Sequence, residues 1–546
     1  PHSWRSKAPV IFRATPQWFI SMEVNKLRET ALKALDATRF VPAAGHTRLS
    51  SMIATRPDWC ISRQRAWGVP IAIFVEKATG EPLRDPAVLE RIATGFAAEG
   101  SDAWFAREPA DFLGADYDPA DYEQVRDIVD VWFESGSTHA FVLETRADLK
   151  WPADLYLEGS DQHRGWFHSS LLESCGTRGR APYDAVLTHG FVMDEQGRKM
   201  SKSLGNTVVP QDVCNDNGAD ILRLWVAGSD YSEDLRIGKE IIQSHVDSYR
   251  RLRNTLRYLL GALAGFSEDE RIDPAEMPQL ERWVLHRVWE IDRLVRRGVE
   301  DFDFTSIIVA VNTFCAVDLS AFYLDVRKDS LYCDRPDSLR RRAVRTVMDT
   351  LFECLTAWLA PITCFTAEEA WWTRHGEDAD SVHERTFPDI PDAWRDDELA
   401  ARWAKIREAR RVVTGAIELK RAAKEIRASL EAHPRLFVDP AQHAGLLAAI
   451  EAMGGAAAGT PEEELADISI TSQLTLLREA PPADAFALPE LPGIGAVIDR
   501  AEGRKCERSW KILPSVGSDP RHPTLTPRDA DAVEAWLARQ GAAAAS

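Results

Sequence analysis

The chain has 546 residues, 45% of them hydrophobic, and a formal net charge of −19 from 66 Lys or Arg and 85 Asp or Glu. This length predicts three or four folding units with sizeable cores. The acidic balance excludes indiscriminate binding to nucleic acid, and no apolar run approaches the eighteen or more residues needed to cross a bilayer.

The eight cysteines lie at positions 60, 175, 214, 315, 333, 354, 364 and 506, without the regular spacing of a disulfide framework. Scattered cysteines are typical of a reducing compartment. No signal peptide opens the sequence. We therefore expect a cytoplasmic protein without a membrane partner.

Residues 151–157 form an apolar run with partial alternation, which predicts a buried strand. Gly159 then allows a tight turn. Asp161, Gln162 and His163 are expected to open a continuous helix. A strand, a glycine turn and a helix N-terminus together present polar groups to a nucleotide in Rossmann-like sheets. The alternative is that Asp161 is only a helix N-cap.

Residues 197–206 read Gly-Arg-Lys-Met-Ser-Lys-Ser-Leu-Gly-Asn, a small polar loop bounded by glycines. Lys199 and Lys202 lie three apart, with Ser201 between them. Such a loop suits the gripping of a polyphosphate while charge moves from one oxygen to another. Taken alone it is also consistent with a solvated surface turn, but the strand and turn upstream favour nucleotide chemistry.

Two later stretches have apolar residues at helical spacing, and they predict a helical bundle from about 241 to 395. The first repeats at Leu285, Val288, Ile291 and Val295, and the second runs from 344 to 359. Residues 401–430 hold nine Lys or Arg and three Glu, a local net charge of +6. This patch would guide a specific RNA to an acidic body, unless it is an ordinary solvated helix face.

Together these segments resemble the class I aminoacyl-tRNA synthetases, and most closely the bacterial isoleucyl type. The run from Gly159 to Phe167 distinguishes the isoleucyl type from the valyl and leucyl types, because those types share the lysine loop but lack this run in the same form. Residues 56–70 and 130–136 also agree with the family, which usually has aspartate at the position of Glu134. The resemblance extends to about residue 388.

The resemblance implies an incomplete α/β Rossmann-like class I catalytic core, an α-helical bundle anticodon-binding domain and a small C-terminal domain. The predicted division is 1–240 for the C-terminal part of the catalytic domain with the lysine loop, 241–395 for the bundle, 396–480 for a helical and linker region, and 481–546 for a degenerate zinc-finger-like tail. The low-complexity stretch at 454–459 is expected to be a linker.

A His-x-Gly-His signature, which the family carries at the start of its catalytic fold, does not occur in residues 1–546. We therefore expect the C-terminal portion of a longer protein, without the first half of the ATP site and without the editing insertion. The isolated chain is then expected to be inactive.

The resemblance implies an isoleucine-tRNA ligase that uses ATP with Mg²⁺, isoleucine and tRNA(Ile), and that is a monomer at full length. Its implied catalytic residues are Lys202, Lys199 and Ser201, and its ATP-binding residues are Lys202, His189 and Gly190. The implied substrate-binding residues are Glu158, Gly159, Asp161, Gln162 and His163. Residue 189 is equally consistent with a structural histidine. The alternatives are a tRNA-binding module without synthetase activity and a valyl-tRNA synthetase.

The segment at 318–332 resembles the family's anticodon-binding domain, with Arg327, Lys328 and Tyr332 as implied tRNA contacts and Ser330 where an arginine is expected. In many bacterial relatives the tail carries four zinc-binding cysteines in two Cys-x-x-Cys pairs. Here only Cys506 remains, and the other three positions fall on Ser509, Thr526 and Asp529. One thiolate cannot hold a structural zinc, so we predict a tail without metal.

Overall fold

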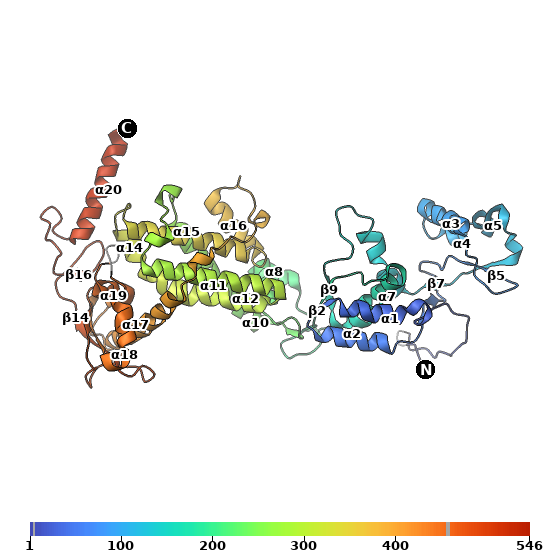
Figure 1. The fold of residues 1–546 in the computed structure, drawn as a ribbon, viewed down its shortest axis with the longest axis horizontal. Helices are drawn as coiled ribbons and strands as arrows, with labels where there is room; N and C mark the ends of the chain where they lie inside the picture. Colours follow the sequence, from blue (N-terminus) through green and yellow to red (C-terminus); the bar gives the residue numbers. More distant parts are fainter. Residues whose placement is uncertain (4–5, 455–458, 546) are drawn as a thin grey trace. The chain divides into compact units, whose positions relative to one another are not determined.

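The computed structural model describes residues 1–3, 6–454 and 459–545. The chain divides into two compact units, shown with their elements in Figure 1. Unit 1 comprises Pro1–Val192 and Tyr231–Leu235, and unit 2 comprises Met193–Asp230 and Arg236–Ser546. Most of the predicted linker, residues 455–458, lies outside the described residues. The predicted four-part division stays a prediction.

Unit 1 is built around a small parallel sheet with the strand order β2-β9-β8. These strands are β2 (Arg39–Val41), β9 (Ala185–His189) and β8 (Tyr156–Gly159). Helix α7 (Trp166–Arg178) connects β8 to β9 and makes a βαβ unit with them. The buried strand predicted at 151–157 is wrong in its bounds, because β8 begins at Tyr156, includes Gly159 and leaves Leu157 and Glu158 exposed. The α/β character of this part of the chain is confirmed.

Unit 1 contains further helices and strands outside this sheet. Its other helices are α1 (Leu27–Asp36), α2 (Ala44–Ala54), α3 (Pro86–Glu99), α4 (Ala103–Ala106), α5 (Pro109–Leu113) and α6 (Val131–Gly136). Its other strands pair as β1 (Phe19–Ile20) with β3 (Trp59–Cys60), β4 (Ser62–Arg63) with β7 (Ile128–Val129), and β5 (Phe74–Glu76) with β6 (Tyr122–Gln124). Strands β10 (Val192–Met193) and β11 (Leu235–Arg236) span the points where the chain passes between the units.

Two separate apolar cores stabilise unit 1. The first lies between the sheet and helices α1, α2 and α7, where Phe167, Leu171 and Val186 are fully buried. The second lies between the β5/β6 pair and helices α3 to α5, where the Trp104 ring packs on Phe74 at 4.9 Å. Burial of these large side chains provides the main favourable free energy of folding.

The expected continuous helix after Gly159 is wrong. Residues Ser160–Arg164 form a short 3₁₀ helix, and the chain then turns at Gly165 before α7 begins. A Cβ on Gly165 would lie 2.8 Å from the Trp132 ring and 2.4 Å from Gln162 Oε1. The close approach of these groups to the backbone requires glycine and interrupts the helix.

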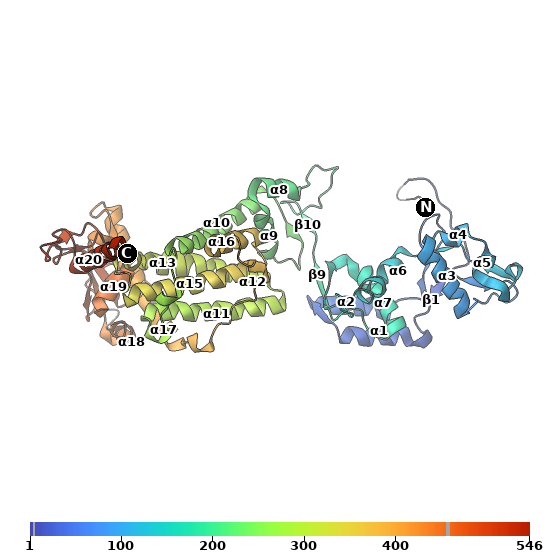
Figure 2. The same cartoon turned by 90° about the horizontal axis from the view of Figure 1, so that it is seen from above.

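Unit 2 begins with α8 (Pro210–Asn217) and α9 (Ala219–Ala227) and continues as a bundle of long helices. The bundle helices are α10 (Lys239–Ala262), α11 (Gln279–Asp301), α12 (Phe304–Thr313), α13 (Leu324–Val326), α14 (Lys328–Cys333), α15 (Leu339–Leu359) and α16 (Cys364–His375). Helices α10, α11 and α15 run side by side (Figure 2). The four apolar repeats from Leu285 to Val295 are all buried on α11, which confirms the predicted helical pattern.

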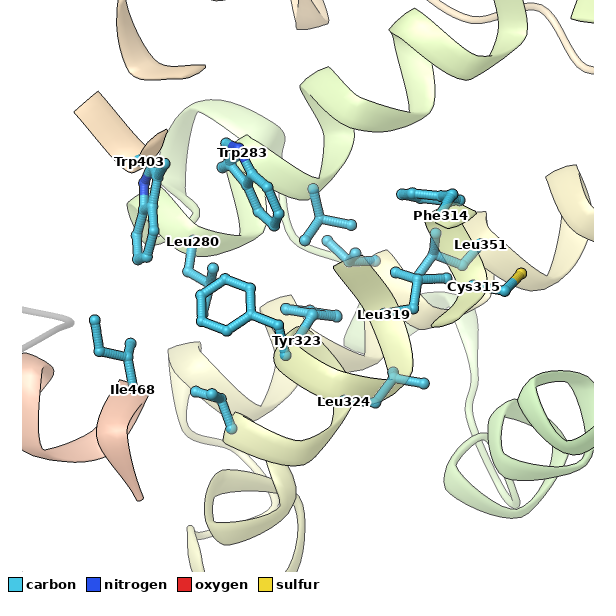
Figure 3. Close-up of a cluster of buried hydrophobic side chains, with 14 of the residues drawn as sticks. Leu280, Trp283, Phe314, Cys315, Leu319, Tyr323, Leu324, Leu351, Trp403 and Ile468 are labelled. Carbon is cyan, nitrogen blue, oxygen red and sulfur yellow. The ribbon is translucent and has the colours of Figure 1, made fainter. Parts of the chain in front are cut away.

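Helix α17 (Asp397–Ala422) joins this bundle to the last part of the chain. The Trp403 ring of α17 lies 6.1 Å from the Trp283 ring of α11, in the core that Figure 3 shows. Ile468 of α19 (Pro461–Ser469) lies in the same core, so the bundle and the following region share one apolar interior.

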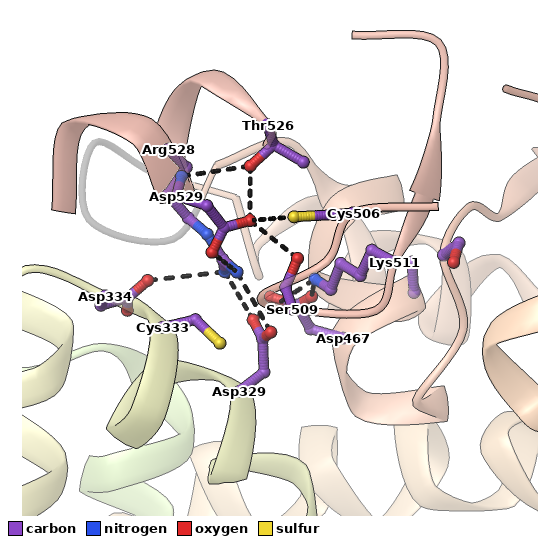
Figure 4. A network of polar contacts seen from close by, with 12 residues as sticks. Asp329, Cys333, Asp334, Asp467, Cys506, Ser509, Lys511, Thr526, Arg528 and Asp529 are labelled. Carbon is purple, nitrogen blue, oxygen red and sulfur yellow. Dashed lines mark hydrogen bonds and ion pairs between the residues drawn. The ribbon is translucent and has the colours of Figure 1, made fainter. Parts of the chain in front are cut away.

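The C-terminal region contains a three-stranded sheet of order β13-β12-β14 and a small hairpin. Its elements are β12 (Ala432–Val438), α18 (Pro440–Glu451), α19 (Pro461–Ser469), β13 (Thr475–Leu477), β14 (Ile494–Arg500), β15 (Arg504–Lys505), β16 (Ile512–Leu513) and α20 (Pro527–Ala545). The hairpin pairs β15 with β16, and it lies close to the start of α20 (Figure 4).

One helical stretch, Phe304–Cys333, is long and apolar enough by length and composition to cross a membrane. This finding contradicts the expectation that no apolar stretch approaches that length. The finding is weak evidence for a membrane span, because a core helix passes the same test, and 56% of the apolar window is buried inside the protein.

Candidate functional site

The carboxyl end of β8 carries the first group of predicted ligand-binding residues. Glu158 is exposed, and its Oε1 accepts a hydrogen bond from the Gly159 backbone at 3.2 Å. A Cβ on Gly159 would lie 2.7 Å from Asp161 Oδ1, so glycine allows the Asp161 carboxylate to fold over the turn. Asp161 is also exposed and accepts a hydrogen bond from Gln162 at 3.1 Å. Two carboxylates at the end of one strand can accept hydrogen bonds from hydroxyl or ammonium groups of a ligand.

Strand β9 carries the second group to the same edge of the sheet. The two strands are parallel, and Gly159 lies opposite His189. A Cβ on Gly190 would lie 2.2 Å from the Glu233 carbonyl oxygen, so the chain at 233 crosses directly over this glycine. The structure thus brings Glu158, Asp161, His189 and Gly190 together at the carboxyl ends of neighbouring strands, where open α/β sheets bind ligands.

Gln162 and His163 have roles inside the fold. Gln162 Oε1 accepts a hydrogen bond from the backbone N–H of Trp166, the first residue of α7, at 3.0 Å. His163 is 2% exposed, its Nδ1 lies 2.7 Å from the Ser160 carbonyl oxygen, and its burial lowers its pKa. A Cβ on Gly45 would lie only 2.9 Å from His163 Nε2. The expected direct ligand contact of His163 is therefore corrected to a packing role beneath the turn.

Helix α7 also buries two ionisable groups that the sequence analysis did not single out. His168 is 3% exposed, and neither ring nitrogen has a hydrogen-bond partner among the described residues. Burial lowers the pKa of His168 to about 3 and raises the pKa of Glu173 to about 9. Glu173 Oε1 also has no described partner. Both groups are neutral at pH 7.

The lysine loop belongs to unit 2, and Asn206 organises it. Asn206 Oδ1 accepts a hydrogen bond from the Ser201 backbone at 2.9 Å, and its Nδ2 donates to Asp194 Oδ2 at 2.9 Å. The hydrogen bond from Asn206 and those from Arg198 lower the pKa of Asp194 to about 2. Asp194 is thus a charged anchor beneath the loop, and the sequence analysis missed this role.

The two lysines of this loop remain exposed. Among residues that the structure describes, neither Lys199 nor Lys202 forms an ion pair. Ser201 shapes the turn, because its Oγ lies 3.1 Å from Ser203 Oγ and accepts the backbone hydrogen bond of Leu204 at 3.3 Å. The loop therefore presents two ammonium groups to solvent on a hydrogen-bonded frame, which suits an anionic ligand.

The segments at 56–70 and 130–136 meet at Asp130. Arg63 Nη2 lies 2.7 Å from Asp130 Oδ2, and Asp130 Oδ1 caps α6 by accepting the Trp132 backbone hydrogen bond. Glu134 Oε1 accepts a hydrogen bond from the Val69 backbone at 3.0 Å. The glutamate thus has a defined structural contact at a position where the family usually has aspartate.

The three predicted RNA contacts differ sharply in exposure. Arg327 is 1% exposed, and its guanidinium donates two hydrogen bonds to Glu281, at 2.7 and 3.0 Å. A buried ion pair of this kind cannot also reach an RNA phosphate, so the predicted contact of Arg327 is corrected to a structural role. Lys328 is exposed beside Asp325, and Tyr332 is 63% exposed. These two residues remain predicted RNA contacts.

The basic patch at 401–430 is partly neutralised by carboxylates. Arg407 lies 2.8 Å from Asp318, and Arg411 lies 2.6 Å from Glu490. Arg421 and Lys420 also pair with Glu side chains of the same patch. The local charge of +6 therefore overstates the positive surface that is open to a ligand.

No cluster of three or more His, Cys, Asp or Glu suited to a metal ion occurs in the described ranges. In the tail, Cys506 lies within hydrogen-bond distance of Asp529, and Ser509 and Thr526 contact the same carboxylate. The four positions that the resemblance assigned to zinc ligands therefore meet at one point.

Comparison with known proteins matches two family models. The model described as tRNA synthetases class I (I, L, M and V) matches residues 5–238, and the model described as the anticodon-binding domain of tRNA ligase matches residues 281–436. The chain is 56% identical to an isoleucine-tRNA ligase of Caulobacter vibrioides over 99% of this chain and 55% of the relative. It is 56% identical to the enzyme of that name from Brucella abortus over 98% of this chain and 54% of the relative.

The chain thus spans about half the length of the curated relatives it matches. Among solved structures, a Mycobacterium tuberculosis methionyl-tRNA synthetase in complex with methionyl-adenylate gives a TM-score of 0.48 at 17% identity. That match covers 70% of this chain and 72% of the other, and a likeness at this level carries no conclusion about function.

Proposed function

We propose that the chain is a portion of an isoleucine-tRNA ligase, a member of the class I aminoacyl-tRNA synthetases. The observation that carries the proposal is the 56% identity with a relative of that name over 99% of the chain. The isoleucine carboxylate would attack the α-phosphorus of ATP to form isoleucyl-adenylate, and pyrophosphate would leave. A hydroxyl of the terminal adenosine of tRNA(Ile) would then take the acyl group, and AMP would leave.

The edge of the sheet in unit 1 would bind the adenylate. Glu158 and Asp161 would accept hydrogen bonds from ribose hydroxyls or from the amino group of isoleucine, and Gly159 would allow the ligand to approach the backbone. His189 and Gly190 would lie near the adenine. These roles are supported by the exposure of both carboxylates and by the register of Gly159 opposite His189.

The lysine loop would stabilise the negative charge that moves onto pyrophosphate. This chemistry depends on positioning and charge stabilisation, with little covalent work for the protein. Lys202 and Lys199 would contact the phosphates, with Mg²⁺ accompanying ATP, and Ser201 would hold the turn. The proposal is supported by the exposure of both lysines and by the Asn206 frame around Ser201.

The helical bundle would bind tRNA(Ile) at the exposed face of α14. Lys328 would contact phosphate, and Tyr332 would contact a base by stacking. A protein with these partners would act in the cytoplasm, as a monomer at full length. Residues 1–546 contain no His-x-Gly-His signature, so we propose that ATP binding needs a further segment beyond them.

Isoleucine-dependent exchange between ATP and pyrophosphate tests the proposal. The assay compares the chain alone with the chain in its full reading frame, and the wild type with Lys202→Ala. We expect exchange only in the longer protein, and a loss of at least about 100-fold in Lys202→Ala. Lys33→Ala is the matched control, because Lys33 is an exposed lysine of α1, far in sequence from the loop.

Each other outcome of the assay supports an alternative. Exchange that depends on valine and not on isoleucine would identify a valyl-tRNA synthetase. Retained tRNA binding without exchange for any amino acid, in the full reading frame, would identify a tRNA-binding module. Full exchange in Lys202→Ala would remove the lysine loop from the mechanism.

A further inference from the structure

The tail contains one carboxylate on which two separate segments converge. Cys506 and Ser509 lie in the turn between β15 and β16, while Thr526 and Asp529 lie at the start of α20 (Figure 4). Asp529 Oδ2 accepts hydrogen bonds from Cys506 Sγ at 3.1 Å, from Ser509 Oγ at 2.7 Å and from Thr526 Oγ1 at 2.6 Å. Asp529 and Cys506 are both fully buried.

These four side chains do not fit a structural zinc ion. Zinc in such sites takes four ligands from thiolates, imidazoles or carboxylates. Here the set provides one thiol, one carboxylate and two hydroxyls, and each of the three protic groups already donates to the carboxylate. The four side chains therefore form a complete hydrogen-bond cluster, but they do not provide the four ligands that a structural zinc ion needs.

We propose that the Asp529 carboxylate replaces a metal ion as the cross-link that closes the tail. A buried anion that accepts three hydrogen bonds forms stronger contacts than neutral acceptors do. Its charge is balanced by Arg528, whose Nη2 lies 3.4 Å from Asp529 Oδ1, and by Arg508 at 3.7 Å. The hydrogen bonds tie the hairpin turn to the start of α20, as metal ligands from two segments would.

The charge state of the cluster agrees with this role. Burial alone would raise the pKa of Asp529, but the hydrogen bonds from Thr526, Ser509 and Cys506 and the charge of Arg528 outweigh burial and lower it. The carboxylate is therefore ionised at neutral pH and can accept all three hydrogen bonds.

The same cluster attaches the tail to the helical bundle at α14. Arg528 Nη2 donates to Asp329 at 3.1 Å, and Arg528 Nη1 lies 3.5 Å from Asp334. Arg508 Nη2 donates to the Tyr332 carbonyl oxygen at 2.9 Å. Because Asp529 fixes the start of α20 beside the hairpin turn, it also fixes the positions of both arginines.

The first test measures metal in the purified full chain. Elemental analysis is expected to find less than about 0.1 zinc per chain, and a chelator such as 1,10-phenanthroline is expected to leave protease resistance of residues 501–530 unchanged. About one zinc per chain, with loss of resistance on chelation, would overturn the proposal.

The second test separates the carboxylate from the thiol. Asp529→Ala is expected to raise the rate of tail proteolysis by at least about tenfold, because three buried donors and two arginines lose their acceptor. Cys506→Ser keeps a donor to Asp529, and its rate is expected to stay within about threefold of the wild type. Asp531→Ala is the matched control, since Asp531 lies two residues further along α20 and forms an exposed ion pair with Arg335.

The pattern of the variants decides the proposal. Equal sensitivity of Cys506→Ser and Asp529→Ala would show that the thiol is the essential group and would overturn it. Wild-type resistance in Asp529→Ala would overturn it as well. If Asp529→Ala does not fold, Thr526→Val removes one of the three hydrogen bonds and is expected to give a smaller increase in the same direction, whereas no increase would count against the proposal.

Discussion

Helix α7 of unit 1 and the helical bundle of unit 2 bury ionisable side chains in opposite ways. On α7 of unit 1, His168 and Glu173 have ring or carboxyl atoms without described partners, and their pKa values move to about 3 and about 9. In unit 2, Arg327 and Glu281 are equally buried but form a two-bond ion pair. Burial without an opposite charge favours the neutral form, whereas burial with a matched charge allows both groups to stay ionised.

The buried charges of unit 2 also form a chain of pairs from the bundle to the tail. Arg340 contacts both Glu464 and Asp467, and Lys511 lies 2.6 Å from Asp467 and 3.5 Å from Asp329. The Asp467 carboxylate lies among these cations, which outweigh its burial and lower its pKa. The comparison predicts that removal of one partner of a buried pair in unit 2 is most destabilising, and that the stability of α7 in unit 1 responds chiefly to pH.

The largest expected effect follows from breaking the Arg327–Glu281 pair. Arg327→Met would leave the fully buried Glu281 without its counter-charge, which costs about 3–5 kcal/mol of unfolding free energy. Denaturant unfolding of the full chain, followed by hydrogen exchange of α11 and α14 amides, measures it. Arg327→Met/Glu281→Met removes both charges and is expected to be less destabilised than the single variant. A double variant that is worse than Arg327→Met would contradict the pairing.

Glu173 provides a pH test in unit 1. Its folded pKa of about 9 exceeds the unfolded value near 4.5, so the folded state binds the extra proton between these values and stability falls as pH rises. From pH 5 to 8 the free energy of unfolding falls by about 2 kcal/mol, a value reduced for partial access of solvent to the Glu173 carboxyl group. Glu173→Gln is expected to flatten this slope, measured as hydrogen exchange of α7 amides at several pH values. An unchanged slope would show that Glu173 is not the titrating group.

His168 is expected to act in the opposite pH range and with a smaller effect. Its folded pKa of about 3 lies below the unfolded value of 6.5, so the unfolded state binds the extra proton between them. Stability is then complete above pH 6.5 and falls by about 1 kcal/mol on acidification to roughly pH 5.5. His168→Asn is expected to remove this acid sensitivity of α7, and Glu173→Gln is expected to retain it.

The local structures that could be predicted from sequence are those with a repeating pattern or a short motif. The apolar face of α11 agrees with the expectation, because helical spacing is a property of neighbouring residues. A strand is also present near the predicted range 151–157, but it begins only at Tyr156 and includes Gly159. The break at Gly165 could not be predicted, since it arises where Trp132 approaches the backbone from a distant part of the sequence.

In the candidate site, too, short motifs predict some features, whereas others depend on residues that are distant in sequence. Glu158, Asp161, His189 and Gly190 meet at one edge of the sheet because parallel strands carry their loops to the same end. The buried position of His163 depends on Gly45, and the loop anchor Asp194 depends on Asn206, so neither role is visible in a single motif. The four tail positions, in contrast, were placed together by resemblance, but their organisation around Asp529 needed the structure.

Lys328 gives the smallest expected effect on stability. Compared with Arg327, it also gives the sharpest form of the comparison, because these two neighbours in sequence have different environments. Lys328 pairs with Asp325 at the surface, and such exposed pairs contribute at most about 0.5 kcal/mol, so Lys328→Ala is expected to unfold almost as the wild type does. If the proposed tRNA contact is correct, the same variant weakens tRNA(Ile) binding about 3- to 10-fold and reduces the salt dependence by about one counterion. Filter binding of the full-length protein at several salt concentrations measures both quantities, with Lys405→Ala on α17 as a second lysine variant. Unchanged affinity in Lys328→Ala would remove Lys328 from the RNA interface, whereas Arg327 would keep its structural role, since that role depends on buried carboxylates, chiefly Glu281.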